Sequence, residues 1–306
     1  MSKKIVFMGT PKFSVQTLEV LAKSPFEIVC VYTQPAKKSS RGQKVNTTLV
    51  QQTAEKLNLE VRTPHSLHQE EEYNYFKLLN PDIVVVVAYG NIIPKKYFKL
   101  SKNGFINIHA SLLPKWRGAA PIQRSIINLE KETGISIMKI EEKLDTGPYM
   151  RQAKVSLGAQ TNAEELSDNL AKLGASNIIE CINLIIKNEA KFIEQKNINA
   201  TYAKKIKKKE ARILWKDEAQ NILAKINAFN PTPGAWFEYG GARYKIWKAE
   251  IVELSGKPGE VLDEKLIIAC KNKSLKIIEI QKEGRNKLSL KEFLAGSKIP
   301  KKFLLT

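Results

Sequence analysis

Long apolar runs, cysteines and histidines are scarce in this chain of 306 residues. The longest apolar runs, such as residues 83–88, fall far short of the roughly 18 residues that a membrane-spanning helix needs, so we expect no transmembrane segment. The three cysteines lie far apart, with no CxxC pair and no histidine at ligand spacing, which argues against structural zinc and disulfides. We interpret them as small buried hydrophobes in a reducing compartment.

The chain also has few features of targeting segments or of fibrous and disordered proteins. Its start, MSKKIVFMG, has no long apolar region and no cleavage site, so we expect no leader. With 16 Gly, 13 Pro, 43% hydrophobic and 26% charged residues, the composition is typical of a globular protein and excludes collagen and global disorder. At roughly 150 residues per domain, the length predicts about two domains.

Positive charge exceeds negative charge, with 50 Lys and Arg against 31 Asp and Glu and a formal net charge of +19. Residues 1–200 hold 27 basic and 19 acidic residues, whereas residues 201–306 hold 23 and 12, so the last third is the more basic part. Such a balance favours an acidic macromolecule as partner. A general bias toward lysine on the surface is an equally simple explanation, so charge alone leaves nucleic-acid binding open.

Strand-like and helix-like segments alternate in the N-terminal half, which predicts an α/β fold with a Rossmann-like open, mostly parallel sheet over residues 1–190. Residues 82–88 (DIVVVVA) are apolar at consecutive positions, as in a strand covered on both faces in the middle of such a sheet. We expect other strands at 3–9, 27–33, 59–62, 104–110 and 134–140, and helices from about residues 13, 47, 69 and 161, the last ending near 187.

Residues 191–209 lack a clear apolar period and accumulate lysines, which is typical of a linker. About five short strands in the last 100 residues then predict a small β-barrel of the oligonucleotide-binding (OB-like) type over residues 210–306. The expected elements are a helix at 218–229, a hairpin at 235–254 that turns at Gly240-Gly241, and short strands at 257–264, 265–272 and 273–281.

Asn107, His109 and Asp145 are the candidate catalytic residues. Sites in open α/β sheets form where loops leave the carboxyl ends of the strands. Alternation along the strand at 104–110 points Asn107 and His109 to the same face, and Asp145 follows the strand at 134–140. Such a set suits attack by a substrate amine on a carbonyl carbon, with Asn and protonated His stabilising the oxyanion and Asp145 orienting the His or removing protons.

The same residues also have structural explanations. Asn107 and His109 are compatible with satisfied polar groups at a strand end, and Asp145 with a turn residue. Ser111 has no G-x-S-x-G elbow around it and no second histidine to serve it, so we do not expect a serine nucleophile. Gly9 opens a βα turn without glycines at the offsets that dinucleotide binding needs, so we do not expect NAD. Spacing alone does not decide between catalysis and structure.

Residues 106–123 (INIHASLLPKWRGAAPIQ), with Asp145 of LDTG 36 positions after His109, resemble the signature of the folate-dependent formyltransferases. The SLLP core is shared across that family, whereas the basic loop after the second strand, EARILW (210–215) and the tail are similar to members that act on an aminoacylated tRNA. Further similar segments are 9–21 (GTPKFSVQTLEVL), 31–45 (VYTQPAKKSSRGQKV), 84–94 (VVVVAYGNIIP), 201–215 and 228–236 (AFNPTPGAW).

The resemblance implies a reaction. The formyl group of 10-formyltetrahydrofolate passes to the α-amino group of methionine esterified to initiator tRNA. Asn107, His109 and Asp145 match the catalytic trio of the family, and no metal is expected. The sequence departs from the family at Ala110, where some members have glycine, and at Pro148-Tyr149, where an acidic residue is common. We therefore expect the loop after Asp145 to differ slightly.

The resemblance also implies the residues that bind the folate. One group is the SLLP segment, for which a tight turn with apolar packing is the structural alternative. The other is the backbone that follows the strand at 82–88, which together with the loop before Asp145 is expected to hold the pterin ring. The implied residues are Ser111, Leu112, Leu113 and Pro114 in the first group and Ala88, Tyr89, Gly90 and Ile92 in the second.

Basic residues in two places are implied to contact the tRNA. The first set lies in a Gly- and Ser-containing loop that is long for an αβ connection and that in this family enters the acceptor stem. The second set lies in the linker, where a solvated basic run is the alternative. The implied residues are Lys37, Lys38, Arg41 and Lys44 in the loop and Lys204, Lys205, Lys207, Lys208 and Lys209 in the linker.

Two other functions remain to be weighed. One is a formyltransferase for a small amine, such as a glycinamide nucleotide or an amino sugar, against which the basic loop and tail argue. The other is a non-catalytic RNA-binding protein, against which the presence of Asn107, His109 and Asp145 argues. For the tRNA enzyme, the expected setting is a bacterial cytoplasm, the expected state is a monomer, and no membrane contact is expected.

Overall fold

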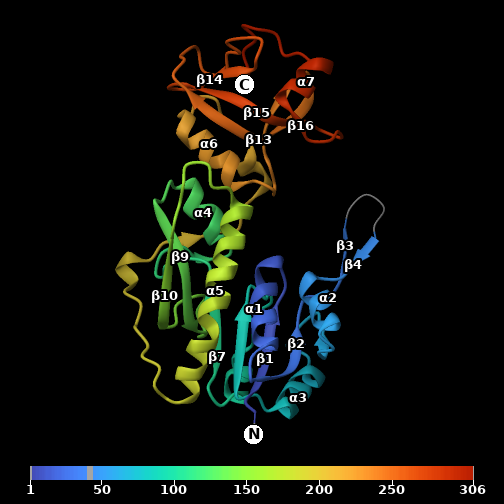
Figure 1. The fold of residues 1–306 in the computed structure, drawn as a ribbon, viewed down its shortest axis with the longest axis vertical. Coiled ribbons are helices and arrows are strands. Elements are labelled where there is room, and N and C mark those ends of the chain that lie inside the picture. The colour runs from blue at the N-terminus through green and yellow to red at the C-terminus, as the bar shows by residue number, and fades with distance from the viewer. Residues whose placement is uncertain (1, 40–43, 306) are drawn as a thin grey trace. The chain divides into compact units, whose positions relative to one another are not determined.

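The computed structural model describes residues 2–39 and 44–305, and their packing forms two compact units. Unit 1 holds the N-terminal strands, and unit 2 holds the C-terminal sheet (Figure 1). The expected boundaries at residues 190 and 209 remain a prediction. Unit 1 comprises Met1–Gly118, Gly134–Val155 and Ser167–Tyr202, and unit 2 comprises Ala119–Thr133, Ser156–Leu166 and Ala203–Thr306.

A seven-stranded sheet forms the frame of unit 1, in the order β10-β9-β7-β6-β1-β2-β5. The pairs from β7 to β5 are parallel, and β9 runs antiparallel to β7. This confirms the predicted open, mostly parallel sheet with the strand of residues 82–88 near its centre. The strands are β1 (Lys4–Gly9), β2 (Glu27–Tyr32), β5 (Val61–Arg62), β6 (Ile83–Val87), β7 (Phe105–His109), β9 (Glu132–Lys139) and β10 (Tyr149–Ser156).

Helices cover both faces of this sheet. On one face, Gly174 of α5 approaches Ile108 of β7 so closely that an added Cβ would lie 2.8 Å from Ile108 Cγ2. An ion pair of 2.8 Å between Lys12 and Asp168 joins α1 to α5. On the other face, α3 and η1 pack on the sheet through Phe76 and Tyr97. The helices are α1 (Lys12–Ala22), α2 (Leu49–Lys56), α3 (Glu70–Leu79), α5 (Ala163–Ile186) and the 3₁₀ helix η1 (Lys95–Leu100).

Strand alternation decides which side chains of β7 face α3 and η1. Phe105 belongs to the buried cluster on that face, together with Val84 and Val86 of the neighbouring β6. Because residues two apart point the same way, Asn107 and His109 share this face with Phe105, whereas Ile108 points to α5. The apolar part of β7 therefore anchors the strand, and its polar residues lie at the carboxyl end.

Some elements of unit 1 were not expected from the sequence. The basic loop contains a two-stranded hairpin, in which Lys37 pairs with Asn46 and Ser39 with Lys44. β10 is half-exposed along most of its length at the edge of the sheet, so it lacks the apolar run that marks an interior strand. The additional strands are β3 (Lys37–Ser39), β4 (Lys44–Asn46) and β8 (Arg117–Gly118).

Unit 2 is built on an antiparallel sheet with strand order β12-β13-β15-β14, in which β16 also pairs with β15. This half-barrel confirms the predicted small β domain, and the hairpin turns at Gly240-Gly241 as expected. Residues 257–264 are mainly turns with isolated bridges, so the strand expected there is wrong. The elements are α4 (Pro121–Ile127), α6 (Ala219–Ala228), β12 (Ala235–Tyr239), β13 (Ala242–Val252), β14 (Ile267–Ala269), β15 (Ser274–Lys282), β16 (Leu288–Ser289) and α7 (Leu290–Gly296).

The segment expected as a linker has short structure of its own, which the lysine-rich sequence did not indicate. It starts in unit 1 and continues into unit 2, and β11 pairs with β8. Its elements are η2 (Asn197–Asn199), β11 (Tyr202–Ala203) and η3 (Lys208–Ala211).

Candidate active site

The candidate site lies in unit 1 at the carboxyl end of β7. Asn107 is half-buried, and its backbone is paired with Val86 of β6 on one side and Met138 of β9 on the other. His109 is the last residue of β7 and is 6% exposed. Both residues are thus held by regular strand pairing, so their Cα positions are fixed by the sheet rather than by a loop.

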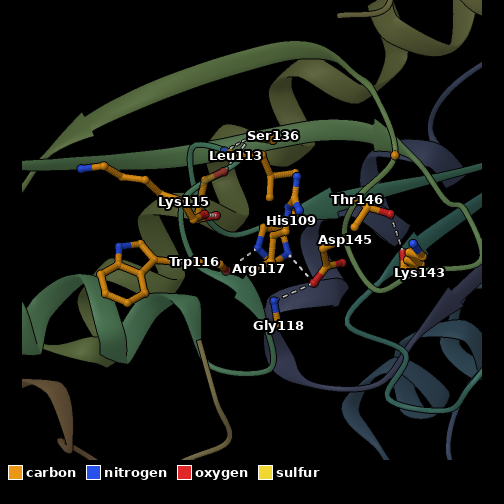
Figure 2. A network of polar contacts seen from close by, with 12 residues as sticks. His109, Leu113, Lys115, Trp116, Arg117, Gly118, Ser136, Lys143, Asp145 and Thr146 are labelled. Atoms are coloured by element: carbon orange, nitrogen blue, oxygen red, sulfur yellow. Dashed lines mark hydrogen bonds and ion pairs between the residues drawn. The ribbon is translucent and has the colours of Figure 1, made fainter. Parts of the chain in front are cut away.

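The His109 ring lies between two acceptors (Figure 2). Its Nε2 is 2.9 Å from the carbonyl oxygen of Trp116, and its Nδ1 is 3.7 Å from Oδ2 of Asp145. A carbonyl oxygen only accepts, so Nε2 carries the proton of that hydrogen bond. Nδ1 then faces the Asp145 carboxylate, so both ring nitrogens have an acceptor beside them. The side chain of Asp145 is 11% exposed, which limits screening of this pair by water.

Asp145 is fixed through its own backbone and through Gly118. Its Oδ2 accepts a hydrogen bond of 2.8 Å from the backbone N–H of Gly118, and its φ of 53° is in the left-handed region. Aspartate adopts this conformation more readily than most residues because its side chain bonds locally. The turn after β9 therefore aims the carboxylate at the end of β7, and the structure brings His109 and Asp145 together.

Gly147 lies where the backbone after Asp145 comes close to β9. A Cβ at Gly147 would lie 2.2 Å from the carbonyl oxygen of Lys139, at the end of β9. Only glycine allows the Asp145 turn to lie so near β9.

Gly147→Ala should therefore lower the free energy of unfolding by about 1–3 kcal/mol, the usual cost of forcing an extra methyl group into a packed site. Urea denaturation measures this change. Gly296→Ala is the matched control, because a Cβ at Gly296 meets no atom within 4 Å. Equal stability changes in the two variants would contradict the close approach as the reason for glycine at 147.

The SLLP segment follows β7 as a compact turn. Ser111 is fully buried and its hydroxyl donates to the carbonyl oxygen of Lys115 at 2.6 Å. Leu113 is also buried, and its backbone N–H donates to Ser136 of β9. Leu112 and Pro114 are half-buried. The polar and apolar side chains of Ser111 and Leu113 thus hold the turn, and its accessible surface comes from Leu112 and Pro114.

The loop after β6 is mostly exposed, whereas the SLLP turn is mostly buried. Ala88, Gly90 and Ile92 are exposed, and Ile92 is 82% exposed. Tyr89 is 2% exposed, and burial raises the pKa of its phenol to about 12. The hydroxyl of Thr10 donates to the carbonyl oxygen of Tyr89 at 2.7 Å. The turn after β1, for which the sequence supported only a structural role, therefore anchors this loop.

The candidate tRNA-binding residues lie in both units. Lys37, Lys38 and Lys44 belong to the β3–β4 hairpin, whereas Arg41 lies outside the described residues. The base of this hairpin is joined by a hydrogen bond of 2.8 Å between the hydroxyl groups of Thr33 and Thr48. In unit 2 the linker lysines are exposed: Lys204, Lys205, Lys207, Lys208 and Lys209.

All three cysteines are buried as predicted, and burial raises the thiol pKa of Cys30 and Cys270 to about 12 and of Cys181 to about 11. Residues 2–39 and 44–305 contain no cluster of three or more His, Cys, Asp or Glu side chains arranged for a metal ion. Within the same residues, none of the helices combines the length and apolarity that crossing a membrane requires.

Sequence reasoning missed three residues that support this site. Gln195, held by Arg117, fixes the Asp145 turn, and the hydroxyl oxygen of Thr201 accepts a hydrogen bond of 2.9 Å from the Trp116 N–H. Two of them lie in the lysine-rich segment that was expected to be a linker, which has no local pattern of a site.

Known proteins share both the sequence and the fold. The family profile described as formyl transferase matches residues 3–182, and that of the formyl transferase C-terminal domain matches residues 205–298. A methionyl-tRNA formyltransferase of Pelagibacter ubique (strain HTCC1062) is 54% identical over 303 residues, which cover 98% of this chain and 98% of the relative.

Two solved structures show the same fold. A methionyl-tRNA formyltransferase from Clostridium thermocellum has a TM-score of 0.57 at 18% identity and covers 82% of this chain and 94% of its own. WlaRD is a sugar 3N-formyl transferase crystallised in the presence of dTdp and 5-N-formyl-THF. It has a TM-score of 0.67 at 22% identity, and the match covers 94% of this chain and 100% of WlaRD. On the evidence of both profiles and of the full-length relative, the chain belongs to the formyl transferase family.

Proposed function

We propose that this protein transfers the formyl group of 10-formyltetrahydrofolate to the α-amino group of methionyl initiator tRNA, which gives N-formylmethionyl-tRNA for translation initiation. The observation that carries the proposal is the pairing of His109 with Asp145 beside Asn107, in a chain 54% identical over its length to a methionyl-tRNA formyltransferase. We further propose a bacterial cytoplasm as its setting and a monomer as its working form.

The surface around the site suits a flat, partly apolar cosubstrate. Ile92 and Leu144 are 82% and 72% exposed, and they lie in the two loops that flank the end of β7. An ion pair of 2.9 Å between Lys95 and Glu142 links the regions of these loops. Pockets for such ligands combine apolar walls with a few polar groups. The residues assigned to the folate are Ala88, Tyr89, Gly90, Ile92, Ser111, Leu112, Leu113 and Pro114.

The catalytic trio divides the work between hydrogen-bond donors and a charge. When bound, 10-formyltetrahydrofolate supplies a formyl carbon that the methionine amine attacks. The bond from that carbon to N10 then breaks, and tetrahydrofolate leaves as the amine loses a proton and N10 gains one. The Asn107 amide donates a hydrogen bond to the oxygen that gains negative charge, and the His109 Nε2 N–H donates to the same oxygen once it exchanges the Trp116 carbonyl for it. Asp145 places a negative charge 3.7 Å from Nδ1 of His109 and fixes the orientation of the ring. The β7 ladder fixes the backbone of both donors before substrate arrives, so only the side chains have to adjust.

The basic segments suit the nucleic-acid end of the substrate. Residues Lys37, Lys38, Arg41 and Lys44 are assigned to the acceptor stem, where phosphate contacts supply affinity and base contacts supply selectivity. The linker lysines, exposed in a group at residues 204–209, are assigned to the phosphate backbone. The glutamate that follows them, Glu210, is paired with Arg124 at 2.8 Å, and the hydrogen bond from Arg124 lowers the Glu210 pKa. Its charge is thus largely compensated within unit 2.

Neutralising Lys37, Lys38 and Arg41 together should weaken tRNA binding and flatten its salt dependence. Each phosphate contact contributes about 0.7–0.9 to the slope of log K against log salt, so three lost contacts should reduce the slope by roughly 2–3. Anisotropy titrations of methionyl-tRNA at several salt concentrations measure it. The charge-matched control replaces the exposed Lys56, Lys77 and Lys99, which lie outside the assigned sites. An unaltered slope in the loop variant would assign the affinity to the linker and tail.

A transfer assay tests the function as a whole. The purified protein is incubated with 10-formyltetrahydrofolate and two acceptors in competition, methionyl initiator tRNA and an amino sugar nucleotide. We expect formyl groups to appear on the tRNA-bound methionine at a kcat/KM at least a hundred-fold higher than on the sugar amine. Preferential formylation of the sugar amine would replace this function with the small-amine alternative, and RNA binding without transfer would favour the non-catalytic one.

A further inference from the structure

The Asp145 turn is held by a residue that lies fifty positions later in the chain. The Nε2 group of Gln195 donates to the carbonyl oxygen of Asp145 at 2.9 Å and to that of Gly147 at 2.7 Å. One amide thus fixes two carbonyl groups, one on each side of Thr146. Both bonds are partly buried, so water competes with them less than at an exposed turn.

Gln195 is in turn oriented by Arg117. The Arg117 side chain is buried, with 2% of the residue exposed, and its Nε donates to Oε1 of Gln195 at 2.9 Å. Its Nη1 donates to Oδ1 of Asn197 at 3.0 Å, which fixes the plane of the guanidinium. Because a guanidinium has only donors, it selects the amide orientation in which the oxygen of Gln195 faces Arg117. The NH₂ group of Gln195 then faces the Asp145 turn.

The same strand segment reaches Asp145 by a second route. Gly118, next to Arg117 on β8, donates its N–H to the Asp145 carboxylate. Backbone N–H of Arg117 donates to the carbonyl oxygen of Thr201 at 2.9 Å, so β8 is itself held by the segment that carries Gln195. Backbone and carboxylate of Asp145 are therefore positioned by one connected set of hydrogen bonds.

We infer that Gln195, locked by Arg117, is a positioning residue that places the Asp145 carboxylate against His109 during formyl transfer. The inference rests on the catalytic role proposed for Asp145. Gln195 does not touch the reacting atoms. Its two hydrogen bonds set where the turn lies, and a misplacement of about 1 Å in a catalytic group can cost about a hundred-fold in rate.

Two substitutions separate positioning from packing. Gln195→Ala removes the side-chain hydrogen bonds to Arg117, Asp145 and Gly147. Gln195→Glu keeps the size of the side chain and strengthens its contact with Arg117. The glutamate has no N–H donor and sets a carboxylate oxygen against the carbonyl oxygens of Asp145 and Gly147. A residue that only fills space would tolerate Glu. The matched control is Asn103→Ala, because the amide of Asn103 also donates to a backbone carbonyl, that of Asp82 at 2.9 Å, at the opposite end of β7.

We expect kcat to fall about ten- to a hundred-fold in both Gln195 variants, with KM for the tRNA and for the folate within three-fold of wild type. Asn103→Ala should retain kcat within two-fold at a comparable melting temperature. A normal kcat in Gln195→Glu, or a loss of kcat in Asn103→Ala as large as in Gln195→Ala, would overturn the inference.

A spectroscopic measurement tests the geometry independently of turnover. The chain has three histidines, and His65 and His68 are exposed and remote in sequence from the trio, so the imidazole resonances of the full-length protein are few. We expect the His109 resonance to shift in Gln195→Ala and those of His65 and His68 to stay in place, with no shift in Asn103→Ala. An unchanged His109 resonance in Gln195→Ala would refute the positioning role. Absence of formyl transfer by the wild-type protein would refute the proposed function, and this measurement would still test the Gln195 contact.

Discussion

Replacing Asp145 by Asn should lower kcat for formyl transfer about a thousand-fold while tRNA affinity stays within a few-fold. The substitution preserves the size of the side chain, and an amide oxygen can still accept from the Gly118 N–H. It removes the negative charge 3.7 Å from His109 Nδ1 and allows an NH₂ group to donate to that nitrogen. The His109 ring then loses its carboxylate partner at Nδ1, while Nε2 keeps its hydrogen bond to the Trp116 carbonyl. Single-turnover formylation measures the loss in the chemical step.

Asp168→Asn provides the matched control. Asp168 also forms an ion pair in unit 1, with Lys12 at 2.8 Å. This pair joins α1 to α5 and is exposed to solvent. Exposed pairs of this kind contribute about 0–1 kcal/mol, so the control should keep its rate and nearly all of its stability. An Asp145→Asn protein that turns over within two-fold of wild type would remove Asp145 from the mechanism, and a parallel loss of tRNA affinity would show a structural role instead.

The parts of the site that regular structure presents could be predicted from the sequence. The apolar run at 82–88 identified β6, and alternation on residues 104–110 placed Asn107 and His109 on one face of β7. For these residues a local pattern and the fold agree, so the sequence carries the information. Asp145 was assigned to the site because it follows the strand at 134–140. β9 runs antiparallel to β7, so its carboxyl end lies beside Phe105, and the turn after it folds back to bring Asp145 to His109.

The parts that depend on contacts distant in sequence were not predictable. Gln195 lies in a polar, lysine-rich segment, where nothing marks it off from its neighbours until the chain folds back on the Asp145 turn. The β3–β4 hairpin was missed because lysine and serine give no apolar alternation. Residues 257–264 have strand-like composition, but they form turns bridged to Leu304 and Ile268. In each case tertiary contacts, rather than local preference, set the conformation.

The roles assigned to the trio, the folate residues and the basic segments stay predictions, because they concern bound substrates. The structure contributes the geometry from which they can be tested. Asn107 offers the sharpest of these tests, because its amide projects from a regular strand and, in the part of the chain that the structure describes, no hydrogen bond joins its side chain to another protein group. The Asn107 amide is therefore free to bond a substrate or water at the end of β7.

Asn107→Ala should therefore lower kcat about a hundred- to a thousand-fold, the usual loss when one donor to a developing oxyanion is removed. Asn107→Asp should be at least as damaging, because a carboxylate of the same size accepts but cannot donate. Steady-state kinetics with both substrates varied should show the loss in kcat, with KM for the tRNA within a few-fold of wild type. Recovery of activity in the Asp variant would mean that the side chain acts by size rather than as a donor.

Thermal unfolding of the same Ala variant distinguishes catalysis from structure. Loss of a buried hydrogen bond normally leaves a partner unsatisfied and costs about 1–3 kcal/mol. Asn107→Ala leaves no protein group without its partner, so its melting temperature should match that of wild type. Asn227→Ala is the comparison, because the buried Asn227 amide donates to the carbonyl oxygen of Ala159 at 3.0 Å, 68 residues away in the sequence. If Asn107→Ala lowers the melting temperature as far as the comparison variant does, Asn107 is a structural residue of the strand end, and the donor role passes to His109 alone.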